Sequence, residues 1–233
     1  MSDVPLPVIE LHQVSHQFQP SRPVLTNITL RLDQPRIGII GSNGSGKSTL
    51  ARLLNGLVLP AQGRVSVDGL DTRRQRRQVG RQVGFVFQNP DSQIILPTVA
   101  EDIEFGLRIL KLPAAVRQQR TVDILKRYNL YPLRHQPAHE LSGGQKQLLA
   151  IAAVLVMQPR YLVFDEPTTL LDLRNRNHIQ QVLRELEQPI VVVSHDLDLL
   201  LDFDRVIVLD QGRVIQDADP ATAIAHYRSL MTP

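Results

Sequence analysis

A glycine-rich segment near the start of the chain has the residue types that hold phosphate groups. Gly41-Ser-Asn-Gly-Ser-Gly-Lys-Ser48 fits the pattern G-x-x-x-x-G-K-[ST]. Its glycines allow backbone N–H groups to turn inward around phosphate oxygens, and a helix starting there adds partial positive charge. Lys47 is expected to bridge the β- and γ-phosphates, and Ser48 to coordinate Mg²⁺. We therefore predict ATP contacts from Gly41, Ser42, Asn43, Gly44, Ser45, Gly46, Lys47, Ser48 and Thr49.

Two acids end the apolar segment Tyr161-Leu-Val-Phe-Asp-Glu166. Asp165 is expected in the Mg²⁺ shell, as the strand-end aspartate is in phosphate-loop enzymes. Glu166 is expected beside the γ-phosphate, where it would polarise the attacking water. Acids also cap strand ends for purely structural reasons, so this pair alone leaves both interpretations open. Together with the phosphate loop, the pair predicts ATP hydrolysis.

A second glycine motif, Leu141-Ser-Gly-Gly-Gln145, opens an expected helix over 146–157. Two glycines and a serine at a helix start form another anion site. An ordinary helix cap is the alternative, but it explains the serine and not the whole string. One nucleotide cannot easily use both loops. Two chains facing head-to-tail could each lend this motif to the nucleotide of the other.

The elements that position these residues alternate between strand and helix. Apolar runs such as Tyr161–Phe164 and Ile190–Ser194 are typical of strands buried on both faces. The chain therefore predicts an α/β fold with a mostly parallel core sheet, a small antiparallel β portion at the N-terminus and a helical insert over about 90–157. Further strands are expected at 8–14, 25–32, 36–40, 64–68 and 83–87, and further helices at 47–57, 98–128 (broken at Pro113), 143–157 and 172–187.

Length and composition limit the class of protein. The 233 residues suit a single domain over 1–233, and the absence of cysteine excludes disulfides and thiolate metal sites. No run approaches the roughly 20 apolar residues that span a bilayer, and no signal peptide is evident. The net charge of +3 is mild, and five arginines fall between Arg73 and Arg81. We interpret that run as a solvated helix or loop face, and expect no nucleic acid partner.

The phosphate loop, the Leu141–Gln145 motif and the acid pair together resemble the ATPase subunit of an ATP-binding cassette (ABC) transporter, a phosphate-loop NTPase fold. The resemblance covers nearly the whole chain. It implies that Ser142, Gly143, Gly144 and Gln145 meet the γ-phosphate of ATP held by a partner ATPase subunit, so that a homodimer is expected.

The resemblance also implies roles for three residues outside these motifs. Gln88 matches a glutamine that contacts Mg²⁺ and water and links the site to the membrane partner. Asp172 matches an aspartate that reaches across the dimer, and His195 matches a histidine that senses the γ-phosphate. Structural alternatives are a solvated loop residue for Gln88, a helix N-cap for Asp172 and a core histidine for His195.

The chain departs from the family pattern at two positions. Phe18 stands where the family usually has a tyrosine under the adenine ring, which keeps a stacking face without the hydroxyl. A core aromatic is the alternative. Leu170 stands where a small residue usually precedes the Leu-Asp pair, which puts the details of cross-dimer contacts in doubt.

Shorter strings point to a subgroup. Phe87–Ile94 is similar to a segment of energy-coupling-factor importers, which pair two ATPases with a membrane coupling protein and a small substrate-binding membrane protein. Thr168–Leu173 and Tyr227–Met231 look most like the biotin importer ATPase. This resemblance implies a peripheral protein on the cytoplasmic side of the bacterial cell membrane. A cobalt or nickel importer, or a non-transport ABC ATPase acting on ribosomes or DNA, is the alternative.

Overall fold

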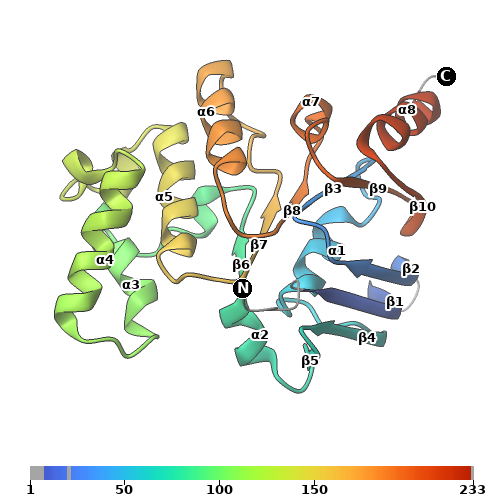
Figure 1. Cartoon of the computed structure of the whole chain (residues 1–233), viewed down its shortest axis with the longest axis horizontal. Helices are drawn as coiled ribbons and strands as arrows, with labels where there is room; N and C mark the ends of the chain where they lie inside the picture. The colour runs from blue at the N-terminus through green and yellow to red at the C-terminus, as the bar shows by residue number, and fades with distance from the viewer. Residues whose placement is uncertain (1–7, 20–21, 232–233) are drawn as a thin grey trace, which may run out of the picture. The chain divides into compact units, whose positions relative to one another are not determined.

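The computed structural model describes residues 8–19 and 22–231. The chain forms two compact units (Figure 1). The first contains the residues up to Phe85, Arg160–Glu166 and the residues from Glu187 onward. The second contains Val86–Pro159 and Pro167–Leu186.

A six-stranded sheet runs through the first unit in the order β10-β9-β3-β8-β7-β6. β3 pairs in parallel with both β8 and β9, and β7 pairs in parallel with β8. β10 lies antiparallel to β9. The strands are β3 (Arg36–Gly41), β6 (Val83–Val86), β7 (Tyr161–Asp165), β8 (Ile190–Val193), β9 (Arg205–Asp210) and β10 (Arg213–Ala218).

The central strands are apolar because they are covered on both faces. Every residue of β7 and β8 is buried, and β3 is buried from Ile37 to Gly41. Such continuous burial gives an unbroken apolar run in place of the alternation of a half-exposed strand. The mostly parallel core predicted from these runs is confirmed.

The N-terminal β portion is a four-stranded sheet in the order β2-β1-β4-β5. β1 pairs antiparallel with β2 and β4, and β4 with β5, which confirms the predicted antiparallel portion. β1, β2 and β4 are longer than expected, and β5 was not predicted. Their bounds are β1 (Ile9–Gln19), β2 (Arg22–Leu32), β4 (Gln62–Val67) and β5 (Leu70–Asp71).

In the described part of the first unit there are four helices. α1 follows the phosphate loop and ends before Gly56, whose φ of +74° suits a glycine after a helix. The predicted end at residue 57 was therefore slightly late. The helices are α1 (Lys47–Leu54), α2 (Arg76–Gln82), α7 (Leu197–Leu200) and α8 (Pro220–Met231).

The second unit is mainly helical. Thr98 and Ser142 each begin a helix with a reciprocal capping box, in which the third helical residue returns a hydrogen bond to the cap. A helix break at Pro113 was predicted, and Pro113 indeed precedes the second of the four helices. They are α3 (Val99–Arg108), α4 (Ala114–Arg127), α5 (Gly143–Leu155) and α6 (Leu173–Arg184), with 3₁₀ turns at Pro90–Ser92, Tyr131–Leu133 and Ala138–Glu140.

Candidate functional site

The phosphate loop joins β3 to α1, as the sequence predicts. Lys47 is the first residue of α1, and its Nζ donates hydrogen bonds to the carbonyl oxygens of Gly41 at 2.9 Å and Ser42 at 3.0 Å. Burial lowers the pKa of the Lys47 ammonium, and the carboxylates of Glu166 and Asp165 offset only part of that effect. The loop thus closes around a buried cation that can face an anion.

The loop is held by a strand hairpin that sequence reasoning did not single out. Ser42 Oγ donates a hydrogen bond to Asp210 Oδ1 at 3.1 Å, and the Gly212 amide donates to the Ser45 carbonyl at 3.1 Å. Gly46 has a φ of +102°, and a Cβ there would lie 2.8 Å from both Leu25 Cδ2 and the Val24 carbonyl oxygen. The β9–β10 hairpin and β2 therefore fix the path of the loop, and no other residue fits at Gly46 without displacement.

Two oxygen ligands of the kind that Mg²⁺ prefers lie together behind the loop. Ser48 Oγ donates to Asp165 Oδ1 at 2.8 Å, and Arg52 Nη2 lies 3.7 Å from Asp165 Oδ2. Burial raises the pKa of Asp165, although Ser48, Arg52 and Lys47 each act against that rise. A buried carboxylate that costs free energy to ionise gains from a cation beside it. The pair fits Mg²⁺ bound jointly by protein and nucleotide oxygens.

A metal site made by the protein alone is not seen. Within the residues that the structure describes, no three histidine, cysteine or acidic side chains gather in a way that could hold a metal ion. Magnesium is usually bound by one or two protein carboxylates together with substrate phosphates.

Glu166 and His195 form the second pair at the carboxyl ends of the core strands. Glu166 follows β7 and is only 5% exposed, and its Oε1 lies 3.1 Å from His195 Nε2. The His195 amide also donates to Glu166 Oε2 at 3.2 Å. Glu166 has a φ of +53°, which is uncommon for a non-glycine residue. The carboxylate of Glu166 and the imidazole of His195 therefore lie in direct contact. His195 is half exposed, which excludes the core-histidine alternative.

The Leu141–Gln145 motif begins α5 in the second unit. Ser142 Oγ accepts a hydrogen bond from the Gln145 amide, and Gln145 Oε1 accepts one from the Ser142 amide at 2.9 Å. This cap explains Ser142 and Gln145 structurally. A Cβ on Gly144 would come within 2.1 Å of Asn175 Oδ1 in α6, so close helix packing requires that glycine.

Asp172 is the N-cap of α6, as one interpretation of the sequence proposed. Its Oδ1 accepts from the Asn175 amide at 2.8 Å, and its Oδ2 accepts from Asn175 Nδ2 at 3.0 Å. Asn175 therefore touches both the predicted cross-dimer aspartate and the space next to Gly144. This residue carried no signal in the sequence.

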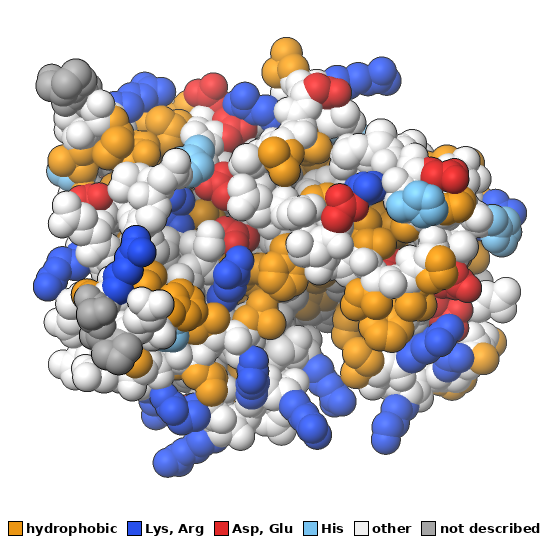
Figure 2. All heavy atoms as spheres, turned by 180° about the vertical axis from the view of Figure 1, so that it is seen from behind, with side chains coloured by type: hydrophobic (Ala, Val, Ile, Leu, Met, Phe, Trp, Pro, Cys, Tyr) orange, Lys and Arg blue, Asp and Glu red, His pale blue; other side chains and the backbone are white. Residues whose placement is uncertain are grey.

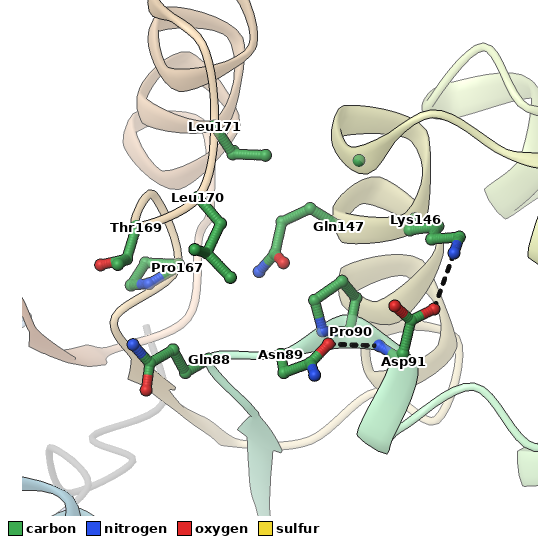
Figure 3. A pocket seen from close by; sticks show the side chains of 11 residues that line it. Gln88, Asn89, Pro90, Asp91, Lys146, Gln147, Pro167, Thr169, Leu170 and Leu171 are labelled. Carbon is green, nitrogen blue, oxygen red and sulfur yellow. Dashed lines mark hydrogen bonds and ion pairs between the residues drawn. The ribbon is translucent and has the colours of Figure 1, made fainter.

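Gln88 lines a cavity of about 160 Å³ in the second unit (Figure 3). Gly143 and the turn Pro167–Leu171 form other parts of its wall. Lys146 Nζ pairs with Asp91 Oδ1 at 2.8 Å at one side. The fold thus brings Gln88, the start of α5 and the segment before Asp172 to one place. Leu170 is 80% exposed and has a φ of +88°.

Three remaining candidate residues have simpler surroundings. Phe18 is 65% exposed, and its ring meets His16 edge-to-face with centroids 4.7 Å apart, which excludes a core role. Asn43 is exposed at the tip of the phosphate loop, whereas Thr49 is buried in the first turn of α1. Phe18 keeps an accessible ring face, and its predicted contact with adenine stays a prediction.

A family model for ABC transporters matches residues 25–169. The chain belongs to the ABC transporter family. An ABC transporter ATP-binding protein of Deinococcus radiodurans is 60% identical over 225 residues, which is 97% of this chain and 99% of that protein. The biotin transport ATP-binding protein BioM of Rhizobium etli is 45% identical over 90% of this chain and 93% of BioM.

Two solved structures extend the comparison. CbiO1 of Clostridium perfringens, part of the ABC transporter complex cbiONQ, has a TM-score of 0.83 at 33% identity and covers 96% of this chain and 92% of that one. The ATP-binding cassette MJ0796, solved as a dimer in a post-hydrolysis state with ADP and Pi, has a TM-score of 0.80 at 30% identity. That match covers 91% of this chain and 98% of the MJ0796 chain. The family and the α/β cassette fold predicted from the motifs are confirmed.

As an ABC transporter ATPase, the chain hydrolyses ATP in support of transport. Among residues 8–19 and 22–231, no helix is both long and apolar enough to cross a membrane.

Proposed function

We propose that this ATPase drives an energy-coupling-factor importer of biotin. The similarity to BioM carries the assignment of cargo, and it agrees with the strings at Thr168–Leu173 and Tyr227–Met231. A cobalt or nickel importer is the second candidate, and the cobalt import ATP-binding protein CbiO of Syntrophus aciditrophicus, 39% identical over 94% of this chain, favours cobalt. No described residue is assigned to cargo in either case, because the ATPase subunit acts on ATP.

The catalytic assignment rests on the Glu166–His195 pair. Glu166 is the general base that polarises water, and His195 supports it while contacting the γ-phosphate. Lys47 binds the β- and γ-phosphates from inside its loop. Ser48 and Asp165 would hold Mg²⁺, and the family resemblance assigns a further contact with the ion to Gln88; the bound ion would supply positive charge against the phosphates.

The working assembly is a pair of ATPase subunits, in which residues 1–233 act as one ATPase domain with a helical subdomain near 90–157. The dimeric MJ0796 cassette supports this arrangement. Ser142–Gln145 and Asp172 of one copy contact the nucleotide bound by the other copy. Phe18 stacks on the adenine of the ATP that is bound by its own copy. The dimer sits on the cytoplasmic side of the membrane, next to a coupling protein and a small cargo-binding protein.

Two variants separate binding from chemistry. Lys47→Ala removes a charged donor, so we expect roughly 100-fold weaker binding of a fluorescent ATP analogue, since charged hydrogen bonds contribute about 1.5–3 kcal/mol each. Glu166→Gln keeps an acceptor for the His195 amide, so we expect unchanged binding and a kcat lower by roughly 100-fold or more. Hydrolysis by Glu166→Gln at the parent rate would exclude Glu166 as the base.

Cargo is tested by uptake. Cells carrying the wild-type chain are compared with cells carrying Lys47→Ala, using labelled biotin and, in parallel, labelled cobalt and nickel. Loss of biotin uptake alone supports the proposal, and loss of metal uptake alone selects the second candidate. Capture from solubilised membranes with ribosomal or DNA-associated proteins and no membrane partner would overturn both.

A further inference from the structure

The arginine segment Arg73–Arg81, predicted from the sequence to be a solvated face, has an ordered arrangement of side chains in the structure. Between Thr72 and Pro90 the chain has five arginines and no acidic residue. All five side chains are exposed. Residues 73–78 line a surface pocket of about 500 Å³ in the first unit. A concave surface with positive charge alone favours an anionic partner.

Two of the five arginine side chains, together with Asp71, hold the segment in place. Arg76 Nη2 donates to the Leu57 carbonyl at 3.0 Å, and Arg73 donates to the Pro60 carbonyl. Asp71 Oδ1 accepts hydrogen bonds from the backbone amides of Arg73 and Arg74. These contacts hold the turn before α2, so the basic surface is pre-formed.

The side chains of the other three arginines, Arg74, Arg77 and Arg81, are exposed, although the charge of Arg74 also acts on Asp71 and helps to lower the pKa of that carboxyl. Within the described residues, the guanidinium groups of Arg74, Arg77 and Arg81 make no hydrogen bond or ion pair with protein. Arg77 and Arg81 are four residues apart on α2, a spacing at which like charges repel. Figure 2 shows Lys and Arg side chains standing out along the lower edge, where α2 and β5 lie, without Asp or Glu among them. Binding of anions would relieve that repulsion.

We propose that Arg74, Arg77 and Arg81 bind the phosphate headgroups of anionic phospholipids. Guanidinium groups match phosphate oxygens with paired donors. Leu57, whose carbonyl accepts from Arg76, is 42% exposed and places an apolar side chain next to the charges. A nucleic acid partner is less suited, because Phe85 is buried and Phe87 is half buried, which leaves no exposed ring in the segment for base stacking.

The test uses the full chain and vesicles. Wild-type protein is sedimented with phosphatidylcholine vesicles and with vesicles in which phosphatidylglycerol replaces part of that lipid. The variant Arg74→Gln/Arg77→Gln/Arg81→Gln is compared with the control Arg22→Gln/Arg108→Gln/Arg213→Gln. Both triple variants lower the formal charge from +3 to 0, but only the first alters the segment.

Each arginine near an anionic surface is expected to contribute roughly fivefold to partitioning, so the segment variant should bind phosphatidylglycerol vesicles about 100-fold more weakly. The control should bind like wild type. Equal binding to both kinds of vesicle, or equal loss in both triple variants, would overturn the proposal. So would tight binding of a mixed-sequence DNA duplex, sensitive to the segment variant, without vesicle binding.

This outcome is separate from the transport proposal. The three arginines lie outside the ATP site, so the ATPase activity of the segment variant should match that of wild type. Failed lipid binding leaves the importer assignment standing, and failed biotin uptake leaves the lipid result standing.

Discussion

Two adjacent glycines in one motif are expected to respond very differently to the same substitution. On Gly144, an added Cβ would lie 2.1 Å from Asn175 Oδ1 and 2.4 Å from Asn175 Cγ. On Gly143, the nearest atom would be Leu171 Cδ2 at 4.0 Å, an ordinary contact. Gly144→Ala must therefore displace Asn175, whereas Gly143→Ala needs no movement.

The magnitude follows from what Asn175 would lose. Overpacking of this kind costs about 1–3 kcal/mol, which includes weakening of the hydrogen bond from Asn175 Nδ2 to Asp172 Oδ2. Alanine in a helix gains about 0.5–1 kcal/mol over glycine. We expect Gly144→Ala to lower the unfolding free energy by about 1–2 kcal/mol and Gly143→Ala to leave it equal or slightly higher.

Urea unfolding of both variants measures this difference, and hydrogen exchange at the Asn175 amide reports the local site. The variant Asn175→Ala completes a double-mutant cycle, because it removes the two atoms that come closest. In that background Gly144→Ala should cost at least about 1 kcal/mol less. Equal stability of the two glycine variants, or an unchanged cost of Gly144→Ala beside Asn175→Ala, would refute the packing argument.

Two other predictions concern charge and backbone strain. Burial alone would raise the pKa of Asp71, but hydrogen bonds from the Arg73 and Arg74 amides and the charges of Arg64 and Arg74 lower it overall. Because the pKa of Asp71 is lowered in the folded state, its carboxylate stabilises the fold above the usual aspartate range near pH 4, and this stabilisation is lost as the pH falls. Asp71→Ala should therefore have a lower melting temperature than wild type at pH 7. The difference between the two melting temperatures should disappear in acid. Leu170 is exposed and has a φ of +88°, so Leu170→Gly should leave the unfolding free energy unchanged or raise it by roughly 0.5 kcal/mol. Leu171→Gly, in contrast, should lower the unfolding free energy. A loss of stability in Leu170→Gly would contradict the strain argument.

The parts of the fold that the sequence predicts are those with strong local causes. β3, β7 and β8 are continuous apolar runs, and α5 begins at a capping box. α2 was not predicted as a helix, because arginines mark an exposed face equally well in a helix or a loop. β9 and β10 carry no motif; the place of β9 depends on pairing with β3, which is distant in sequence, and β10 follows as the second strand of a hairpin with β9.

The same limit applies to the site. Lys47, Ser48, Asp165 and Glu166 were predictable because the chemistry demands those residue types at strand ends and helix starts. Asp210 was not predictable, because its contact with Ser42 joins residues far apart in sequence. An aspartate at the end of a hairpin strand is also common and gives no sign of such a contact. Asn175 was missed for a similar reason, since its role lies in the space beside Gly144.

Leu170 links the departure seen in the sequence to a physical cost in the structure. The family pattern has a small residue at this position, and the backbone there has a positive φ that favours glycine. The leucine gains little from burial, because most of its side chain is exposed, yet it lines the cavity that Gln88 and Gly143 share. The stability of the isolated chain therefore does not explain why a leucine occupies this strained and exposed position. Under the proposed dimer it would be covered beside Asp172, so its substitution should weaken association between subunits more than it changes the fold.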